Sequence, residues 1–227
     1  MCGVCVGIED TVTWIGHASF ILKDGDTNIF VDPFRVAKTN EKADVILVTH
    51  AHFDHCSKDD IRKLQSSGTR IVAAPGCLDA KEFPGITIAR PGFSAEIAGV
   101  KIEAIPAYNT KQERLQFHPR SNDWVGYIVS ANGMRIYHAG DTDFTEEMKK
   151  LDDIDVALLP IGGTYTMDVD EAISAANAIG AKHSVPMHYK NLLGKQGSAA
   201  AEGRFAKNAK NATILHEVQE PTYSFGK

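Results

Sequence analysis

Four side chains that can bind metal lie within six residues of one another. The sequence reads HAHFDH from His50 to His55, directly after the apolar run Val45–Thr49. A continuous apolar run of this length is typical of a strand that is buried on both faces. Side chains alternate along extended backbone, so His50 and His52 can face one side together, and a turn beyond them can aim Asp54 and His55 at a second point. Because imidazole and carboxylate groups bind zinc, iron and related ions, the run predicts a metal site at the end of a buried strand.

The composition excludes several other classes of protein. Of the 227 residues, 43% are hydrophobic and 23% are charged, close to the average of globular domains. The net charge of −5 gives the chain no general attraction to nucleic acid or to anionic membranes. No apolar run approaches the roughly 20 residues of a transmembrane helix. The sequence has no GxSxG motif, no phosphate-binding loop and no GxGxxG motif, so it offers no serine nucleophile or nucleotide site of these kinds.

The first residues carry no targeting signal that we recognise. Residues 1–13 have no Lys or Arg, whereas a secretory signal begins with basic residues, so we expect a cytoplasmic protein. Cys2 and Cys5 form a CxxC pair, but no second pair completes a zinc ribbon. We therefore expect residues 1–10 to be a flexible N-terminus and residues 11–227 to form a single domain.

Strands and short helices alternate along the chain. The turn signals Asp-Gly at 24–25 and Asn-Gly at 132–133 predict two β-hairpins. Residues 145–151 read as a short helix, a second helix ends at Ile179, and Thr213–Val218 reads as the last strand. Many paired strands with helices between them favour two sheets covered by helices over one doubly wound parallel sheet.

The HxHxDH run is the hallmark of the metallo-β-lactamase superfamily, which the chain resembles from about Thr11 to Val218. The resemblance implies an α/β (α+β) fold, a four-layer αββα sandwich with metals bound at the ends of the two sheets. It implies that Asp32, in the segment FVDP, supports the metal-binding loop. It also implies that Asp141, in HAGDT, is a bridging carboxylate and that His188, in VPMHY, is the last histidine of the site.

One position departs from the family pattern. The family has a histidine at the end of a middle strand, where this chain has Asn109, and His118 follows nine residues later. Either His118 reaches back to the metal, or Asn109 leaves one ion short of a nitrogen ligand. We predict that His118 completes the site. Both residues lie in the patternless stretch 106–123, and long loops in compact domains are usually functional or mobile.

Three further segments, WIGHASF, YHAGDT and PIGGTYTM, resemble the L-ascorbate-6-phosphate lactonase-like branch of the superfamily. By this resemblance His17 would lie near the metals, as a substrate contact or a support for the ligands; the alternative is a core histidine. His138 reads as a buried histidine whose hydrogen bonds are satisfied within the core. Thr164 and Tyr165 belong to a Gly-rich loop that either faces the substrate or forms a plain turn.

The resemblance implies a metal-dependent hydrolase with two divalent ions, zinc first, with manganese or iron as alternatives. The expected ligands of the first ion are His50, His52 and His118, those of the second are Asp54, His55 and His188, and Asp141 bridges them. A metal-bound, bridging hydroxide would cleave an ester, lactone or phosphoester bond of a small substrate, with Asp54 and Asp141 as the catalytic residues. The branch suggests a phosphorylated substrate, for which Arg114, Arg120 and Lys190 are the candidate contacts.

Two other functions remain open from the sequence. The same ligands accept iron, so an iron-dependent oxidoreductase is one alternative. A non-catalytic, metal-stabilised module that binds RNA or protein is the other, although the acidic balance does not favour it. We expect a small-molecule substrate and no nucleic-acid or membrane partner, and a homo-oligomer is compatible with the composition.

Overall fold

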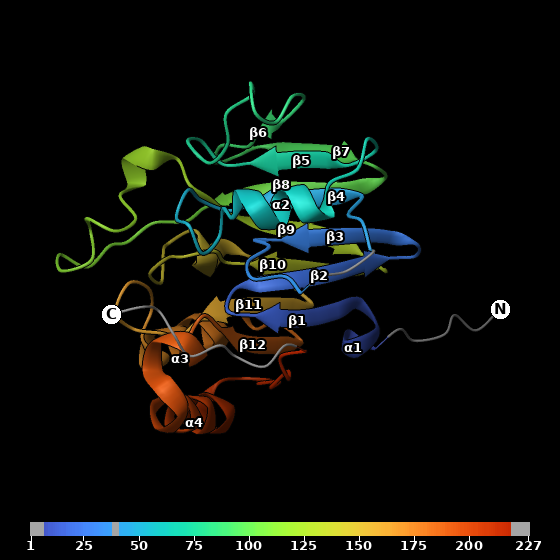
Figure 1. Ribbon diagram of the computed structural model, residues 1–227. Coiled ribbons are helices and arrows are strands. Elements are labelled where there is room, and N and C mark those ends of the chain that lie inside the picture. The colour runs from blue at the N-terminus through green and yellow to red at the C-terminus, as the bar shows by residue number, and fades with distance from the viewer. Residues whose placement is uncertain (1–6, 38–40, 219–227) are drawn as a thin grey trace.

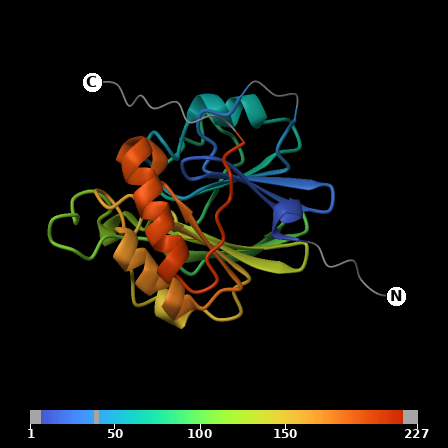
Figure 2. The same cartoon turned by 90° about the horizontal axis from the view of Figure 1, so that it is seen from below.

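Two six-stranded sheets pack face to face and carry helices on their outer faces (Figure 1). The computed structural model describes residues 7–37 and 41–218. The strand order is β1-β2-β3-β4-β5-β6 in the first sheet and β12-β11-β10-β9-β8-β7 in the second. Figure 2 shows α2 outside the first sheet, with α3 and then α4 beside the second. This arrangement is the αββα sandwich that the sequence predicts.

Each sheet mixes antiparallel hairpins with parallel strands. The strands of the first sheet are β1 Val12–Gly16, β2 Ser19–Asp24, β3 Thr27–Val31, β4 Val45–Val48, β5 Arg70–Ala73 and β6 Thr87–Ile88. Those of the second are β7 Ser94–Ile97, β8 Val100–Pro106, β9 Val125–Ala131, β10 Met134–His138, β11 Val156–Pro160 and β12 His183–Met187. The helices are α1 Ile8–Thr11, α2 Lys58–Leu64, α3 Val169–Ile179 and α4 Lys190–Asn208, with the 3₁₀ turns η1 Arg120–Asn122 and η2 Met148–Lys150.

The central strands of both sheets are buried along their whole length. All residues of β4 and of β11 are inaccessible to solvent, as their continuous apolar sequences predict. Both strands pair in parallel with a neighbour, and parallel strands are normally covered on both faces. The buried hydrophobic side chains form one continuous cluster between and around the sheets.

Both predicted hairpins are present, and their turns bind each other. The β2–β3 turn follows Asp24 and the β9–β10 turn contains Asn132. The backbone N–H of Asn132 donates to Asp24 Oδ1 at 2.8 Å, and the backbone N–H of Gly25 donates to Asn132 Oδ1 at 2.9 Å. These two bonds tie the first sheet to the second at one end of the sandwich.

Two predicted elements differ in the structure. Thr213–Val218 is not a strand, because it joins two different partners: the backbone N–H of Thr213 donates to Ser184 in β12, and that of Val218 donates to Trp14 in β1. The segment therefore crosses from one sheet to the other instead of extending either. Within residues 145–151 only the short 3₁₀ turn η2 forms.

Only part of the N-terminal segment lies within the described residues. Residues 8–10, which we assigned to a flexible terminus, begin helix α1. Cys2 and Cys5 lie outside the described residues. Among the described residues, no helix combines the length and the apolar character that a membrane span needs.

Candidate metal centre

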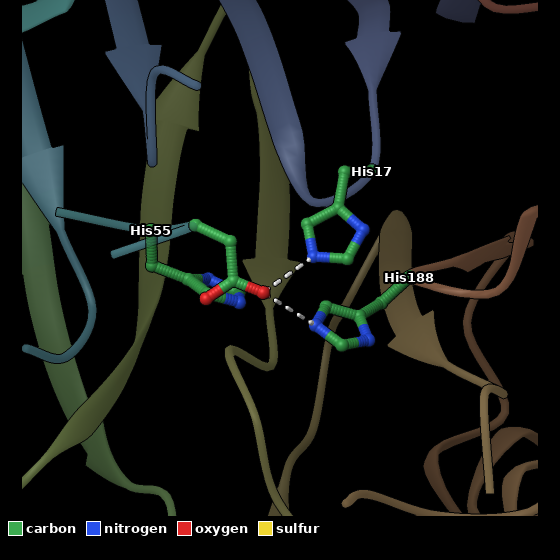
Figure 3. A group of neighbouring side chains, drawn as sticks. His17, His55 and His188 are labelled. Carbon is green, nitrogen blue, oxygen red and sulfur yellow. Dashed lines mark hydrogen bonds and ion pairs between the residues drawn. The ribbon is translucent and has the colours of Figure 1, made fainter. Parts of the chain in front are cut away.

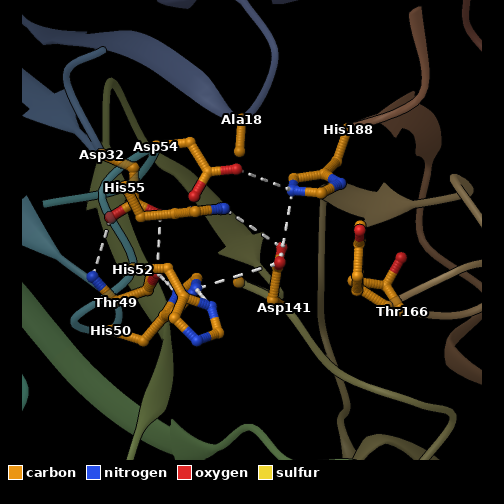
Figure 4. Close-up of polar contacts among 12 residues, drawn as sticks. Ala18, Asp32, Thr49, His50, His52, Asp54, His55, Asp141, Thr166 and His188 are labelled. Carbon is orange, nitrogen blue, oxygen red and sulfur yellow. Dashed lines mark hydrogen bonds and ion pairs between the residues drawn. The ribbon is translucent and has the colours of Figure 1, made fainter. Parts of the chain in front are cut away.

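Predicted metal-binding residues that follow three different strands meet at one edge of the sandwich (Figure 4). His50 and His52 follow β4, Asp141 follows β10, and His188 follows β12. The carboxylate of Asp141 lies between two groups of nitrogen and oxygen atoms, and each group is compact enough to hold one metal ion.

The first group consists of His50, His52, His118 and Asp141. His50 Nε2 and His52 Nδ1 are 3.1 Å apart, and His118 Nε2 lies 3.4 Å from Asp141 Oδ2. Nitrogen ligands about 2.0–2.1 Å from one tetrahedral ion are themselves separated by roughly 3.3 Å. The 3.1 Å spacing of the two histidine nitrogens therefore fits ligands of one ion.

The second group contains the three residues predicted from the sequence and one more, and consists of His17, Asp54, His55 and His188. His188 Nε2 is 3.2 Å from Asp141 Oδ2, and His55 Nε2 is 3.3 Å from Asp141 Oδ1. Asp54 Oδ2 lies 3.0 Å from His17 Nε2 and 3.9 Å from His188 Nε2 (Figure 3). Asp141 thus faces both groups.

Asp32 orients the histidine run from the end of β3. It is fully buried and accepts hydrogen bonds from the backbone N–H of Thr49 at 2.7 Å and from the Thr49 hydroxyl at 2.6 Å. His55 Nδ1 lies 2.7 Å from the same carboxylate. A proton on His55 Nδ1 that is donated to Asp32 leaves Nε2 with a free lone pair toward Asp141. This is the support that metal-binding histidines normally have.

The position of His118 depends on Asn109. The backbone N–H of Asn109 donates to the His118 carbonyl at 2.8 Å, which closes the loop between them. Asn109 Oδ1 lies 2.8 Å from His118 Nδ1 and accepts the backbone N–H of His118 at 3.1 Å. Since Nδ1–H donates to the amide oxygen, His118 Nε2 faces Asp141. The structure therefore brings His118, rather than Asn109, into the first group, and places Asn109 against His118.

We predict that Asn109→Ala weakens metal binding and lowers kcat/KM by about 10–100-fold, the usual effect of losing a partner that orients a ligand. The titration of metal-free protein with zinc would measure the first effect. Asn132→Ala is the matched control, because the Asn132 side chain also accepts a backbone hydrogen bond but lies in a hairpin turn away from the site. An Asn109→Ala affinity equal to that of the Asn132→Ala control would contradict the positioning role.

Burial sets the protonation of most histidines in the site. It lowers the pKa of His17 to about 4, and the neighbouring His188 adds to the shift. Burial also lowers the pKa values of His50 and His52. These rings are therefore neutral near pH 7 and have lone pairs available for a metal ion.

The two carboxylates and His55 behave differently because opposite charges face them. Burial opposes the ionisation of Asp141, but His188 and His55 outweigh it and hold its pKa well below the usual range. Burial also opposes the ionisation of Asp54, yet the hydrogen bond from His17 keeps its pKa low. Burial disfavours the charged form of His55 as well, but Asp141 and Asp32 raise its pKa. A metal ion at His55 would displace this proton.

Unsatisfied hydrogen-bonding atoms in the cluster also indicate a metal centre, independently of the HxHxDH motif. Among the described residues, several buried side-chain atoms have no hydrogen-bond partner, and four of them point into this cluster: His55 Nε2, His118 Nε2, His188 Nε2 and Asp141 Oδ1. Unsatisfied buried polar atoms are costly, so a concentration of them calls for a ligand. Imidazole nitrogens and carboxylate oxygens are ligands that suit divalent ions such as zinc.

A cavity of about 460 Å³ opens onto the cluster. Its lining includes metal-site residues from both groups together with these side chains: Phe53, Phe117, Tyr165, Asn191 and Leu192. Of these five residues, only Tyr165 is predicted from the sequence. A signal was available for two of the others, because Phe53 and Phe117 directly adjoin metal-site residues in the sequence.

Three further residues singled out from the sequence do not line the cavity. His138 is fully buried, where Nε2 donates to the Ala18 carbonyl at 2.8 Å and Nδ1 accepts the backbone N–H of Gly140, so it is the satisfied inner histidine of the prediction. Thr164 is exposed in a turn and does not line the cavity. His17 belongs to the second group and contacts Asp54 at 3.0 Å.

The three candidate phosphate contacts are engaged elsewhere. Arg114 is buried between Asp143 and Glu171, at 3.0 and 2.6 Å. Arg120 pairs with Glu147 at 3.0 Å, and Lys190 lies 3.7 Å from Glu217. None of the three lines the cavity, so the prediction that they contact a substrate phosphate there is wrong. Each of these cations lies near a carboxylate instead, and the sequence alone does not show that these carboxylates lie nearby.

Gly162 lets the backbone after β11 pass close to His188. A Cβ atom at position 162 would lie 2.4 Å from the His188 carbonyl oxygen and 2.7 Å from Leu192 Cδ1. We predict that Gly162→Ala costs about 1–3 kcal/mol of folding stability through overpacking and weakens metal retention by moving His188. Gly203→Ala is the control: nothing lies within 4 Å of the added carbon, and alanine should stabilise α4 by about 0.5–1 kcal/mol. Equal thermal stability of the two variants would contradict the prediction.

An αββα sandwich with a histidine and carboxylate cluster at one edge defines a class of metal-binding proteins. Residues 11–188 match the family model described as a beta-lactamase superfamily domain. The chain is 31% identical to the UPF0173 metal-dependent hydrolase of Thermoplasma volcanium, over 92% of this chain and 97% of that relative. It therefore belongs to the metallo-β-lactamase superfamily, as a metal-dependent hydrolase of the UPF0173 family.

Solved structures agree with this assignment. A protein of Parabacteroides distasonis whose name places it among metal-dependent hydrolases is 35% identical, with a TM-score of 0.80 over 92% of this chain and 93% of that one. The metallo hydrolase Igni18 of Ignicoccus hospitalis is 26% identical, with a TM-score of 0.70 over 92% and 95% of the two chains.

Proposed function

We propose that this hydrolase uses two divalent ions, zinc or manganese, to cleave an ester or lactone bond of a small molecule. His50, His52 and His118 would hold one ion, and Asp54, His55 and His188 the other, with Asp141 shared between them. The observation that supports this proposal is the place of Asp141, whose two oxygens lie 3.2–3.4 Å from nitrogens of His55, His118 and His188. When bound, such ions lower the pKa of a water molecule from 15.7 to about 7 and polarise a carbonyl or phosphoryl oxygen.

The residues of the chain supply orientation and proton transfer. Asp54 lines the cavity as an ionised carboxylate, and the bond from His17 at 3.0 Å fixes one of its oxygens. Its other oxygen can therefore accept and orient a proton from the attacking water. Asp32 and Asn109 hold His55 and His118 in the tautomers that the site needs.

The test is metal-dependent hydrolysis by the full chain. Protein stripped with a chelator, and shown to be folded by circular dichroism, would be assayed with p-nitrophenyl butyrate, a δ-lactone and bis(p-nitrophenyl) phosphate. We expect ester and lactone hydrolysis to disappear on stripping and to return when zinc or manganese is added. Hydrolysis that is unaffected by stripping, or absent for the whole panel after reloading, would contradict the proposed function.

A further inference from the structure

We propose that the substrate carries an uncharged, apolar group on the side of its reacting bond that lies away from the metals. This inference rests on the proposed function and specifies its substrate class. Beside the metal-site residues, the lining of the cavity includes four largely apolar side chains, Phe53, Phe117, Tyr165 and Leu192, which we call the apolar wall. These side chains come from three loops and from the first turn of α4.

The apolar wall is open to solvent, so it is not simply part of the core. Phe53 is 65% exposed and Tyr165 is 38% exposed, although both are large rings. Phe117 packs edge-on against Tyr165, with the ring centroids 4.8 Å apart, and both rings line the cavity. Exposed aromatic side chains beside a polar cluster are typical of small-molecule sites, in which a few polar groups fix the orientation and apolar groups bind the rest.

The same wall offers nothing that would neutralise an anion. Among the described residues, no Lys or Arg lines the cavity, and beyond the metal-site residues its polar groups are the uncharged amide of Asn191 and the hydroxyl of Tyr165. The cationic side chains suggested by the sequence are held by carboxylates away from the cavity, Arg114 by Asp143 and Glu171. A phosphate or carboxylate on this side of the substrate would lose hydration without gaining a counter-charge, which is unfavourable.

The metal ions do not remove this selectivity. They would act on the reacting carbonyl group, at the cluster around Asp141, whereas the apolar wall meets the remote part of the substrate. A charged group on the remote part of the substrate is therefore disfavoured by the apolar wall, even though the reacting carbonyl group lies in a polar site. We infer that acyl chains or aromatic groups, rather than sugar phosphates, occupy the wall.

Two hydroxamic acids test the inference by binding alone. Hexanohydroxamic acid and adipic acid monohydroxamic acid share a metal-binding group and a six-carbon chain, and differ only in a remote methyl or carboxylate group. Calorimetric titration of the zinc-loaded full chain at pH 7 should show that the hexano compound binds at least about 10-fold more tightly. Equal binding, tighter binding of the charged compound, or no binding of either would overturn the inference.

A charge placed on the wall should alter the preference. In Leu192→Arg the new guanidinium should narrow the difference between the two compounds at least about five-fold. Leu115→Arg is the matched control, because Leu115 is 39% exposed and does not line the cavity, and it should leave the preference unchanged. Tyr165→Lys serves the same purpose if Leu192→Arg does not fold. An unchanged preference in the wall variants would also overturn the inference.

Ester hydrolysis separates this inference from the proposed function. With monophenyl adipate and phenyl hexanoate as substrates, we expect the higher kcat/KM for the hexanoate, mainly through a lower KM. Faster hydrolysis of the adipate would overturn the apolar substrate class and leave metal-dependent hydrolysis standing. If the hexano hydroxamate binds more tightly but neither ester is hydrolysed, the preference for an apolar group is supported and the proposed hydrolase function is contradicted.

Discussion

Replacement of Asp141 by alanine is expected to abolish metal retention and to lower kcat/KM by more than about 100-fold, beyond the range for residues that only orient ligands. The reason is the position of this carboxylate between the two groups of the site. Its oxygens lie within 3.4 Å of nitrogens from His55, His118 and His188. Without it, the two groups lose the one carboxylate that faces both of them. Metal analysis and ester hydrolysis by the purified variant measure both effects.

The expected loss is specific to the charge and place of Asp141. Asp141→Asn keeps the side-chain volume and should lose metal to a similar extent, since an amide cannot provide the shared negative charge. Asp170→Ala, at an exposed position in the first turn of α3, should retain wild-type metal content. Wild-type metal content and turnover in Asp141→Ala would show that this residue is not part of the site.

Replacement of Arg114 by leucine is expected to cost about 3–5 kcal/mol of folding stability, because it leaves a buried carboxylate without its cation. Arg114 is only 4% exposed, and it donates to the carbonyl of Thr166 as well as pairing with Asp143 and Glu171. Asp143 in turn accepts a hydrogen bond from Asn109 Nδ2 at 3.1 Å. Urea unfolding of the metal-loaded protein measures the loss.

The Arg114 variant should also affect the metal site. Arg114 pairs with Asp143, Asp143 accepts a hydrogen bond from Asn109, and Asn109 in turn bonds His118. Loss of the Arg114–Asp143 ion pair should therefore weaken zinc binding. Arg120→Leu is the control: this arginine is 68% exposed and pairs with Glu147, so its loss should cost no more than about 1 kcal/mol. A stability loss below 1 kcal/mol for Arg114→Leu would contradict a structural role for its buried ion pair.

The parts of the site that the sequence predicts depend mainly on local geometry. His50, His52 and Asp54 lie within one strand end and the following turn, so alternation of side chains and one turn are enough to place them. Asp141 and His188 come from other strands, and only the resemblance to a family indicated that they belong to the same site. The structure brings them together because the ends of β4, β10 and β12 meet at one edge.

The parts that the sequence could not predict depend on contacts between distant segments. Arg114 is a reasonable phosphate contact until Asp143 and Glu171, which come from other loops and helices, are placed beside it. The role of Asn109 follows only from closure of the loop that ends at His118. The apolar pattern of Thr213–Val218 resembles a strand, but hydrogen bonds to both sheets prevent it from joining one.

The central claim is that one chain provides two adjacent metal positions that share Asp141. The most direct measurement is the metal content of the full chain by plasma mass spectrometry, after loading with zinc or manganese and removal of free ions. We expect about two ions per chain in the wild type and loss of metal in Asp141→Ala, with the fold retained. Folded wild-type protein that holds no metal, or a single ion that is insensitive to the loss of Asp141, would contradict the claim.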